Sequence, residues 1–165
     1  MFLLDTPILL ELRNARRRGA DNGVTAWASR VARDRLFISA LAIGELEAIC
    51  ARAARQDKAS GAALQAWVRQ QVVPAFDGHI LPVDAIVALR RGDVAVEGER
   101  NALIAATALE HSLILVTFDK AMFKRARIRL LDPRTDDEDE VGEESNWRAA
   151  SRSRPQWLRS LFIRG

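Results

Sequence analysis

Short apolar runs separated by longer amphipathic segments make up most of this chain. Such runs lack the apolar–polar alternation of strands with one face in water, so we expect them to form strands buried on both faces. Four runs have this character, and a fifth is a weaker candidate. They are residues 2–5, 36–39, 79–84 and 113–117, with 128–131 as the fifth.

The segments between these runs carry apolar residues at helical spacing. In one of them, Ile43, Leu46 and Ile49 fall on a single helical face. The expected helices are a short one starting at Pro7 and further ones over 24–33, 42–55, 60–73, 85–96 and 101–111. The expected N-caps are Thr6, Asp84 and Asn101, and Pro74 is expected to stop the helix over 60–73.

Strands that alternate with helices predict an α/β fold, an α/β/α sandwich whose central sheet is mostly parallel. We expect one such domain over residues 1–133 and a charged, flexible tail over 134–165. The tail begins with seven acidic residues within 135–144 and continues with five arginines within 145–165. Blocks of like charge of this kind are typical of solvated segments.

Composition excludes several classes of protein. Cys50 is the only cysteine among 165 residues, so an internal disulfide and a cysteine zinc site are both excluded. No apolar run reaches the ~20 residues that cross a bilayer. The first apolar stretch contains Asp5 and no basic residue precedes it, which argues against a secretory signal. We therefore expect a cytoplasmic protein.

Polar residues that suit metal chemistry fall at one edge of the predicted sheet. Asp5 ends the first strand, Glu45 lies early in the helix after the second, and Asp119 follows the fourth. Asn101 begins the helix that leads into that fourth strand. Ligands of open parallel sheets bind beyond the carboxyl ends of the strands. Hard oxygen donors at that edge predict a site for Mg²⁺ or Mn²⁺, with the three carboxylates in catalytic positions.

Each of these residues also has a purely local interpretation. Asp5 fits a turn that binds backbone N–H groups, Glu45 fits a solvent-facing position, and Asp119 and Asn101 both fit helix caps. Hydroxyls flank the same edge, at Thr6, Ser39 and Thr117. They either hold carboxylates or serve as caps.

Five stretches of the sequence occur in the order seen in PIN-domain ribonucleases. They are FLLDTPILLEL, FISALAIGELEAIC, HILPVDA, NALIAATALEHSLILVTFD and RLLDP. Over about residues 1–133 the chain resembles the VapC-type toxins of bacterial toxin–antitoxin pairs. The resemblance implies a PIN-like α/β/α sandwich, a Mg²⁺- or Mn²⁺-dependent endoribonuclease, a cognate antitoxin as partner and a homodimer.

The acidic quartet that the resemblance implies falls on Asp5, Glu45, Asn101 and Asp119, all as metal ligands. Two positions depart from the family pattern: an Asp is expected at Asn101, and an Asn at Pro7. An amide offers an oxygen to a metal but no charge, so the substitution predicts a weakened enzyme. Glu97 or Glu99 is a candidate substitute ligand. The alternative is a catalytically degenerate PIN domain that binds RNA or antitoxin.

The charge distribution suggests where an RNA substrate would bind. Residues 1–133 hold 19 Lys and Arg against 15 Asp and Glu, a net charge of +4. Lys120, Lys124 and Arg125, with Arg127 nearby, follow Asp119 closely and are candidates for holding RNA phosphates. A solvated basic surface is the alternative. Trp27 and Trp67 have helical spacing within apolar faces, which favours packing in the core or in a dimer over base stacking.

Overall fold

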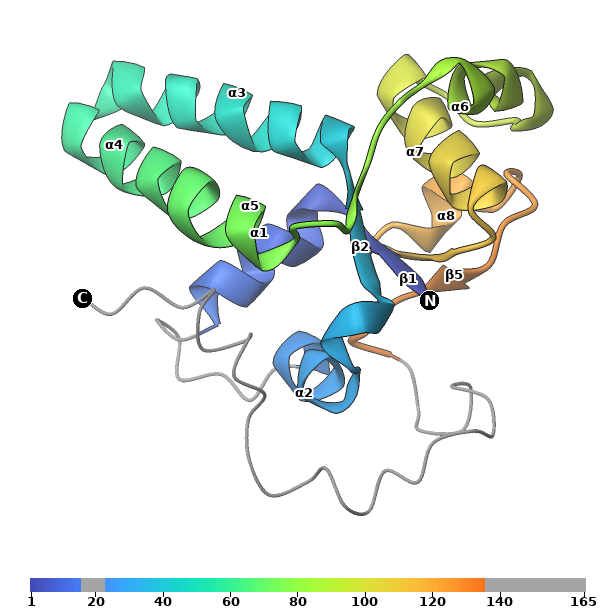
Figure 1. Ribbon diagram of the computed structural model, residues 1–165, viewed down its shortest axis with the longest axis horizontal. Helices are drawn as coiled ribbons and strands as arrows, with labels where there is room; N and C mark the ends of the chain where they lie inside the picture. The colour runs from blue at the N-terminus through green and yellow to red at the C-terminus, as the bar shows by residue number, and fades with distance from the viewer. Residues whose placement is uncertain (16–22, 136–165) are drawn as a thin grey trace.

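Five parallel strands form the central sheet, in the order β3-β2-β1-β4-β5 (Figure 1). The computed structural model describes residues 1–15 and 23–135, so the tail predicted over 134–165 lies outside the described residues except for its first two residues. The strands are β1 (Phe2–Leu4), β2 (Leu36–Ser39), β3 (Ile80–Leu81), β4 (Ile114–Val116) and β5 (Leu130–Leu131). All five predicted strands are therefore present, each within its predicted range.

Both faces of the sheet are buried, as the continuous apolar runs predict. Phe2 and Leu4 point to one face and pack with α1, α2 and the α3–α4 pair. Leu3 points to the other and packs with residues of α6, α7 and α8. Helices accordingly cover both faces of the sheet in Figure 1. The predicted α/β/α sandwich is confirmed.

Most predicted helices are present with shifted bounds, and one further short helix, α8, was not predicted. The helices are α1 (Thr6–Asn14), α2 (Gly23–Arg30), α3 (Ala40–Gln56), α4 (Lys58–Trp67), α5 (Val73–Ala75), α6 (Ala85–Arg90), α7 (Glu99–Glu110) and α8 (Lys120–Phe123). The helix predicted over 85–96 ends early, in a 3₁₀ turn over Arg91–Asp93. Val94 and Val96, which suggested that it continued, are instead buried in the extended connection to α7.

Pro74 does not stop the helix over 60–73 as predicted. After α4 the backbone passes through a π-turn over Val68–Val72 and continues as α5, with Pro74 inside its first turn. A proline lacks the N–H that an α-helix uses at that position, and the wider π-turn just before it changes the hydrogen-bond register. The chain therefore stays helical through the proline.

Two of the three predicted N-caps are wrong. Asp5 and not Thr6 caps α1, and its Oδ1 accepts the Thr6 N–H at 2.9 Å. Helix α7 begins at Glu99 behind Gly98, whose φ of 78° is easily adopted by glycine, so Asn101 lies inside the first turn. The cap at Asp84 is confirmed, because its Oδ1 accepts the Val87 N–H at 2.9 Å.

The α3–α4 pair extends away from the sheet as a helical hairpin (Figure 1). Its helices approach closely at Gly61, where an added Cβ would lie 2.4 Å from the Cβ of Ala54. Trp67 and Cys50 are buried in this hairpin. Trp27 of α2 is also buried, so both tryptophans pack in the core. Within residues 1–15 and 23–135, none of the helices has the length and apolar character needed to cross a membrane.

Candidate active site

Three elements meet at the carboxyl edge of the sheet, where β1 ends. Strand β1 lies between β2 and β4, so the segments that follow these two strands flank Asp5 at the end of β1. Helix α3 starts directly after β2 and carries Glu45 in its second turn. Helix α7 carries Arg100 in its first turn. This edge is where the strand order reverses direction, which is the usual ligand position in an open α/β sheet.

Asp5 fits both of its interpretations, as a local acceptor of backbone N–H groups and as a side chain at the predicted site. Its side chain is buried, with Oδ1 accepting the Thr6 N–H and Oδ2 accepting the Thr117 hydroxyl at 2.9 Å. The first of these bonds caps α1, and the second links it to the end of β4. The carboxylate is thus a structural cap that also points into the edge where the site was predicted.

Arg100 joins the two acidic side chains. Its Nη2 lies 2.5 Å from Oδ1 of Asp5 and 2.6 Å from Oε2 of Glu45. The Thr6 hydroxyl donates a further hydrogen bond to the same Glu45 oxygen. Of the three flanking hydroxyls, those of Thr6 and Thr117 therefore hold carboxylates, whereas that of Ser39 accepts the Leu41 N–H and caps α3.

The charge of Arg100 is strongly favoured in this position. Burial is the largest single influence on its pKa and lowers it, but hydrogen bonds and charge interactions with Glu45 and Asp5 outweigh burial, so the pKa is raised above its ordinary value. The guanidinium is therefore permanently positive between two carboxylates. Its buried Nε has no hydrogen-bond partner within the described residues, so the arginine is not fully satisfied.

Sequence reasoning missed Arg100. Its only signal is its place, directly before Asn101 and the ALIAATA stretch of the family motif. The Arg100 side chain turns toward Asp5 at the end of β1, which is 95 residues away in the chain. Sequence patterns do not reveal this contact.

Asn101 contacts this cluster through Arg100. Its Oδ1 accepts a hydrogen bond from Nη1 of Arg100 at 2.9 Å, and its Nδ2 lies 3.5 Å from the backbone oxygen of Glu97. The proposed substitute acids lie elsewhere: the carboxylate of Glu99 pairs with Arg91 at 3.0 Å and is 69% exposed, and Glu97 is exposed as well. Neither is among the contacts of Asp5 and Glu45.

Asp119 lies at the end of the neighbouring strand, but its carboxylate is engaged elsewhere. Oδ1 accepts the Met122 N–H at 3.0 Å and caps α8, as the local interpretation expected. Its backbone N–H donates to the Thr117 hydroxyl at 3.3 Å, and this hydroxyl binds Asp5. The structure therefore joins Asp5, Glu45 and Asn101 around Arg100 and leaves the Asp119 carboxylate beside them, turned to α8.

The chemistry of the Asp5–Glu45 pair fits a cation. Two carboxylate oxygens from different elements converge on one nitrogen of a positively charged guanidinium. The described parts of the chain contain no cluster of three or more Asp, Glu, His or Cys side chains arranged to hold a metal. In this arrangement a divalent ion would find two carboxylates, with Arg100 between them.

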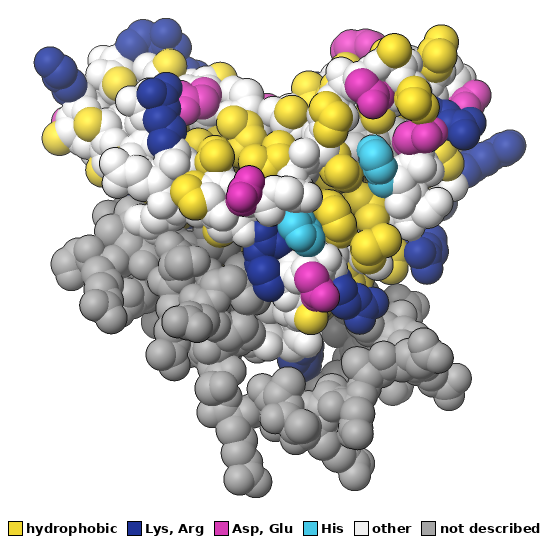
Figure 2. Space-filling view, in the orientation of Figure 1, with side chains coloured by type: hydrophobic (Ala, Val, Ile, Leu, Met, Phe, Trp, Pro, Cys, Tyr) yellow, Lys and Arg dark blue, Asp and Glu magenta, His cyan; other side chains and the backbone are white. Residues whose placement is uncertain are grey.

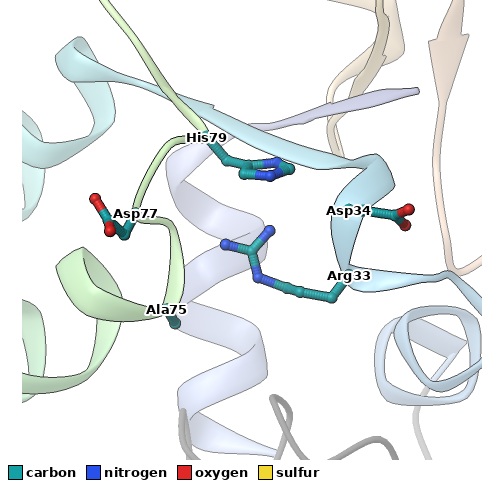
Figure 3. Close-up of a pocket in the computed structure, with 5 residues that line it drawn as sticks. All are labelled: Arg33, Asp34, Ala75, Asp77 and His79. Atoms are coloured by element: carbon teal, nitrogen blue, oxygen red, sulfur yellow. The ribbon is translucent and has the colours of Figure 1, made fainter.

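The predicted basic residues lie close to this edge in the sequence, on and after α8. Lys124, Arg125 and Arg127 are exposed, and Lys120 is half-buried. A separate open cavity of about 500 Å³ lies at the opposite, amino edge of the sheet, where the chain enters β2 and β3 (Figure 3). It is lined by Arg33, Asp34, Ala75, Asp77 and His79. None of the residues predicted for the site lines it.

The sequence matches the PIN domain family over residues 2–128. Toxin FitB of Neisseria gonorrhoeae is 31% identical over 141 residues, which cover 81% of this chain and 98% of that protein. VapC ribonuclease Y4jK of Sinorhizobium fredii is 28% identical over 142 residues, with 81% and 97% covered. In the structure of FitAB bound to a DNA fragment, one chain is 26% identical, covers 84% of this chain and 99% of its own, and aligns with a TM-score of 0.72. The chain belongs to the PIN-domain family.

Proposed function

We propose that this chain is the toxin of a toxin–antitoxin pair and acts as a metal-dependent endoribonuclease. The observation that supports this most strongly is the convergence of Asp5 and Glu45 on one cationic atom in a chain of the PIN family. Relatives named as a VapC ribonuclease and as a toxin, matched over nearly their whole length, support the same activity.

Asp5 and Glu45 would hold the divalent ion, Mg²⁺ or Mn²⁺. When bound, such an ion lowers the pKa of a water molecule and neutralises charge on the phosphate under attack. The hydroxyls of Thr117 and Thr6 keep the two carboxylates in place. We assign Asp119 as the third catalytic carboxylate and Asn101 as a donor of an amide oxygen. The Thr117 hydroxyl keeps the Asp119 backbone beside Asp5, and the Asp119 carboxylate would have to release the Met122 N–H to reach the ion.

The RNA backbone would lie along the basic residues at and after α8. Three cations follow Asp119 within six residues, and their charges attract phosphates: Lys120, Lys124 and Arg125. Their exposure leaves Lys124 and Arg125 open to a large ligand.

A cognate antitoxin is the proposed protein partner. A similar chain occurs in FitAB bound to DNA, and the relative FitB from Neisseria gonorrhoeae is itself called a toxin.

The homodimer implied by the resemblance is part of the same proposal. Apolar side chains gather over the α6 side of the molecule in Figure 2, and Ile86 and Leu89 of α6 are exposed. We propose that the pair acts in the cytoplasm.

A cleavage assay tests this function. Purified chain without antitoxin is incubated with mixed-sequence RNA in EDTA, in Mg²⁺ and in Mn²⁺, beside the Asp5→Asn and Asp77→Asn variants. Asp77 is an exposed acid at the opposite edge of the sheet and serves as the matched control. We expect cleavage in either metal, none in EDTA and none by Asp5→Asn. RNA binding without cleavage in every condition would instead support the degenerate binding module.

A further inference from the structure

Arg100 occupies the position between Asp5 and Glu45 that a divalent ion would need. We propose that Arg100 is a built-in counter-cation that competes with the metal for this carboxylate pair. The inference rests on the proposed function, because it concerns the metal that this function requires. The proposal assigns to Arg100 the role of setting the metal concentration at which the site is filled.

The contacts place Arg100 where a metal bridging the two acids would lie. A single atom, Nη2 of Arg100, lies 2.5 Å from Asp5 Oδ1 and 2.6 Å from Glu45 Oε2. Mg²⁺ binds oxygens at about 2.0–2.1 Å, so an ion bound to these same two oxygens would overlap Nη2. Metal and guanidinium would therefore compete for this pair of oxygens.

The arginine is held in a way that allows it to leave. Its side chain is 30% exposed, so one route to solvent is open. Its buried Nε has no acceptor in the described residues, and part of its hydrogen-bonding capacity is unused. Its contact with the Asn101 oxygen is to a neutral group. Within the described residues, its attractive charge interactions are with the two carboxylates, Asp5 and Glu45.

Asn101 strengthens this competition. Two carboxylates and one guanidinium carry a net charge of −1. An acid at position 101 would make that charge −2 and attract a divalent ion more than a monovalent guanidinium. The combination of Arg100 and Asn101 thus favours the metal-free, ion-paired state of the site.

Mn²⁺ binding to the full chain tests the proposal, measured by electron paramagnetic resonance of the free ion. The test variant is Arg100→Gln and the control is Arg91→Gln. Arg91 also pairs with a glutamate and is similarly exposed, 35% against 30%, but contacts neither Asp5 nor Glu45. We expect Arg100→Gln to bind Mn²⁺ at least ~10-fold more tightly than the unchanged chain, as expected of a neighbour that tunes a metal site. Arg91→Gln should bind as the unchanged chain does.

Thermal unfolding provides a second readout that does not depend on activity. In EDTA, Arg100→Gln should unfold at a lower temperature than the unchanged chain because two carboxylates lose their counter-charge, and Mn²⁺ should restore the unfolding temperature. Arg100→Lys keeps the charge but offers fewer hydrogen bonds, so its Mn²⁺ affinity should lie between the other two even if the glutamine variant fails to fold.

Equal Mn²⁺ affinity of the unchanged chain and the Arg100 variants would overturn the proposal. Its failure is distinguishable from failure of the proposed function. If Arg100→Gln binds Mn²⁺ more tightly and no variant cleaves RNA, the counter-cation proposal stands and the ribonuclease proposal falls. If the unchanged chain cleaves RNA and its Mn²⁺ affinity equals that of Arg100→Gln, the reverse holds.

Discussion

Thr117 donates its hydroxyl hydrogen to Oδ2 of Asp5 at 2.9 Å, across 112 residues of sequence. The bond joins the ends of two neighbouring parallel strands, β1 and β4. It satisfies the one carboxylate oxygen of Asp5 that neither the α1 cap nor Arg100 uses. The same hydroxyl accepts the Asp119 N–H, so one threonine links both acidic strand ends. The position of the central carboxylate therefore depends on Thr117.

Replacement of Thr117 by Val should destabilise the fold. Valine keeps the shape but leaves the buried Oδ2 of Asp5 without a donor, which costs about 1–3 kcal/mol in the free energy of unfolding. Thr117→Ser retains the hydroxyl and should lose much less. Urea denaturation of the three chains measures the difference. Equal stability of the Val and Ser variants would show that the hydroxyl contributes nothing to holding Asp5.

The close approach of α3 and α4 predicts opposite effects for two glycines. A Cβ at Gly61 would lie 2.4 Å from Ala54, so Gly61→Val should overpack the hairpin and cost about 1–3 kcal/mol. Gly44 lies within α3 with nothing within 4 Å of an added Cβ. Gly44→Ala should therefore stabilise the fold by about 0.5–1 kcal/mol through helix propensity. Thermal unfolding of both variants checks the signs, and a stable Gly61→Val would contradict the packing between these two helices.

The basic residues after Asp119 predict a salt dependence of RNA binding. If Lys124 and Arg125 each hold a phosphate, replacing both by Gln should reduce the slope of log affinity against log salt by about 1 for each phosphate that is no longer bound. The charge-matched control is Arg52→Gln with Arg55→Gln, two exposed positions toward the far end of α3. Fluorescence anisotropy with labelled RNA across a salt series gives both slopes. An unchanged slope in the first double variant would assign this cluster to solubility.

Asn101→Asp should raise both metal affinity and RNA cleavage. Aspartate retains an acceptor for Arg100 and adds a negative charge to the cluster, which favours a divalent ion over the guanidinium. The expected gain is at least ~10-fold in Mn²⁺ affinity. In the first turn of α7 the added charge also suits the helix dipole, worth about 0.3–1 kcal/mol. Isothermal titration with Mn²⁺ and the cleavage assay, applied to both chains, are the measurements. A lower Mn²⁺ affinity of the Asn101→Asp variant would mean that the new carboxylate strengthens the binding of Arg100 more than that of the metal.

The sheet could be predicted from sequence because its central strands appear as apolar runs, whereas the fifth run is interrupted by Arg129 and was the weaker candidate. The N-caps were harder to predict. Thr6 and Asn101 are both suitable capping residues, but α1 and α7 start earlier in the sequence, so the N-caps are Asp5 and Gly98. The carboxyl-edge rule correctly indicated Asp5 and Glu45 as neighbours, since it depends only on which residues follow parallel strands. The position of Arg100 depends on a long side chain crossing between elements, and the orientation of Asp119 depends on a competing backbone N–H at Met122. Periodicity contains no information on either.

The most direct test of the proposed active site compares two glutamates of α3. Glu45 and Glu47 are almost equally exposed, 34% and 32%, and each pairs with an arginine, but only Glu45 lies against Arg100 and the Asp5 cluster. The measurement is the rate of RNA cleavage in Mn²⁺ by the Glu45→Gln and Glu47→Gln variants. We predict that Glu45→Gln loses cleavage by at least ~100-fold while Glu47→Gln cleaves as the unchanged chain does. Equal cleavage by the two variants would contradict an active site at the Asp5–Glu45 pair.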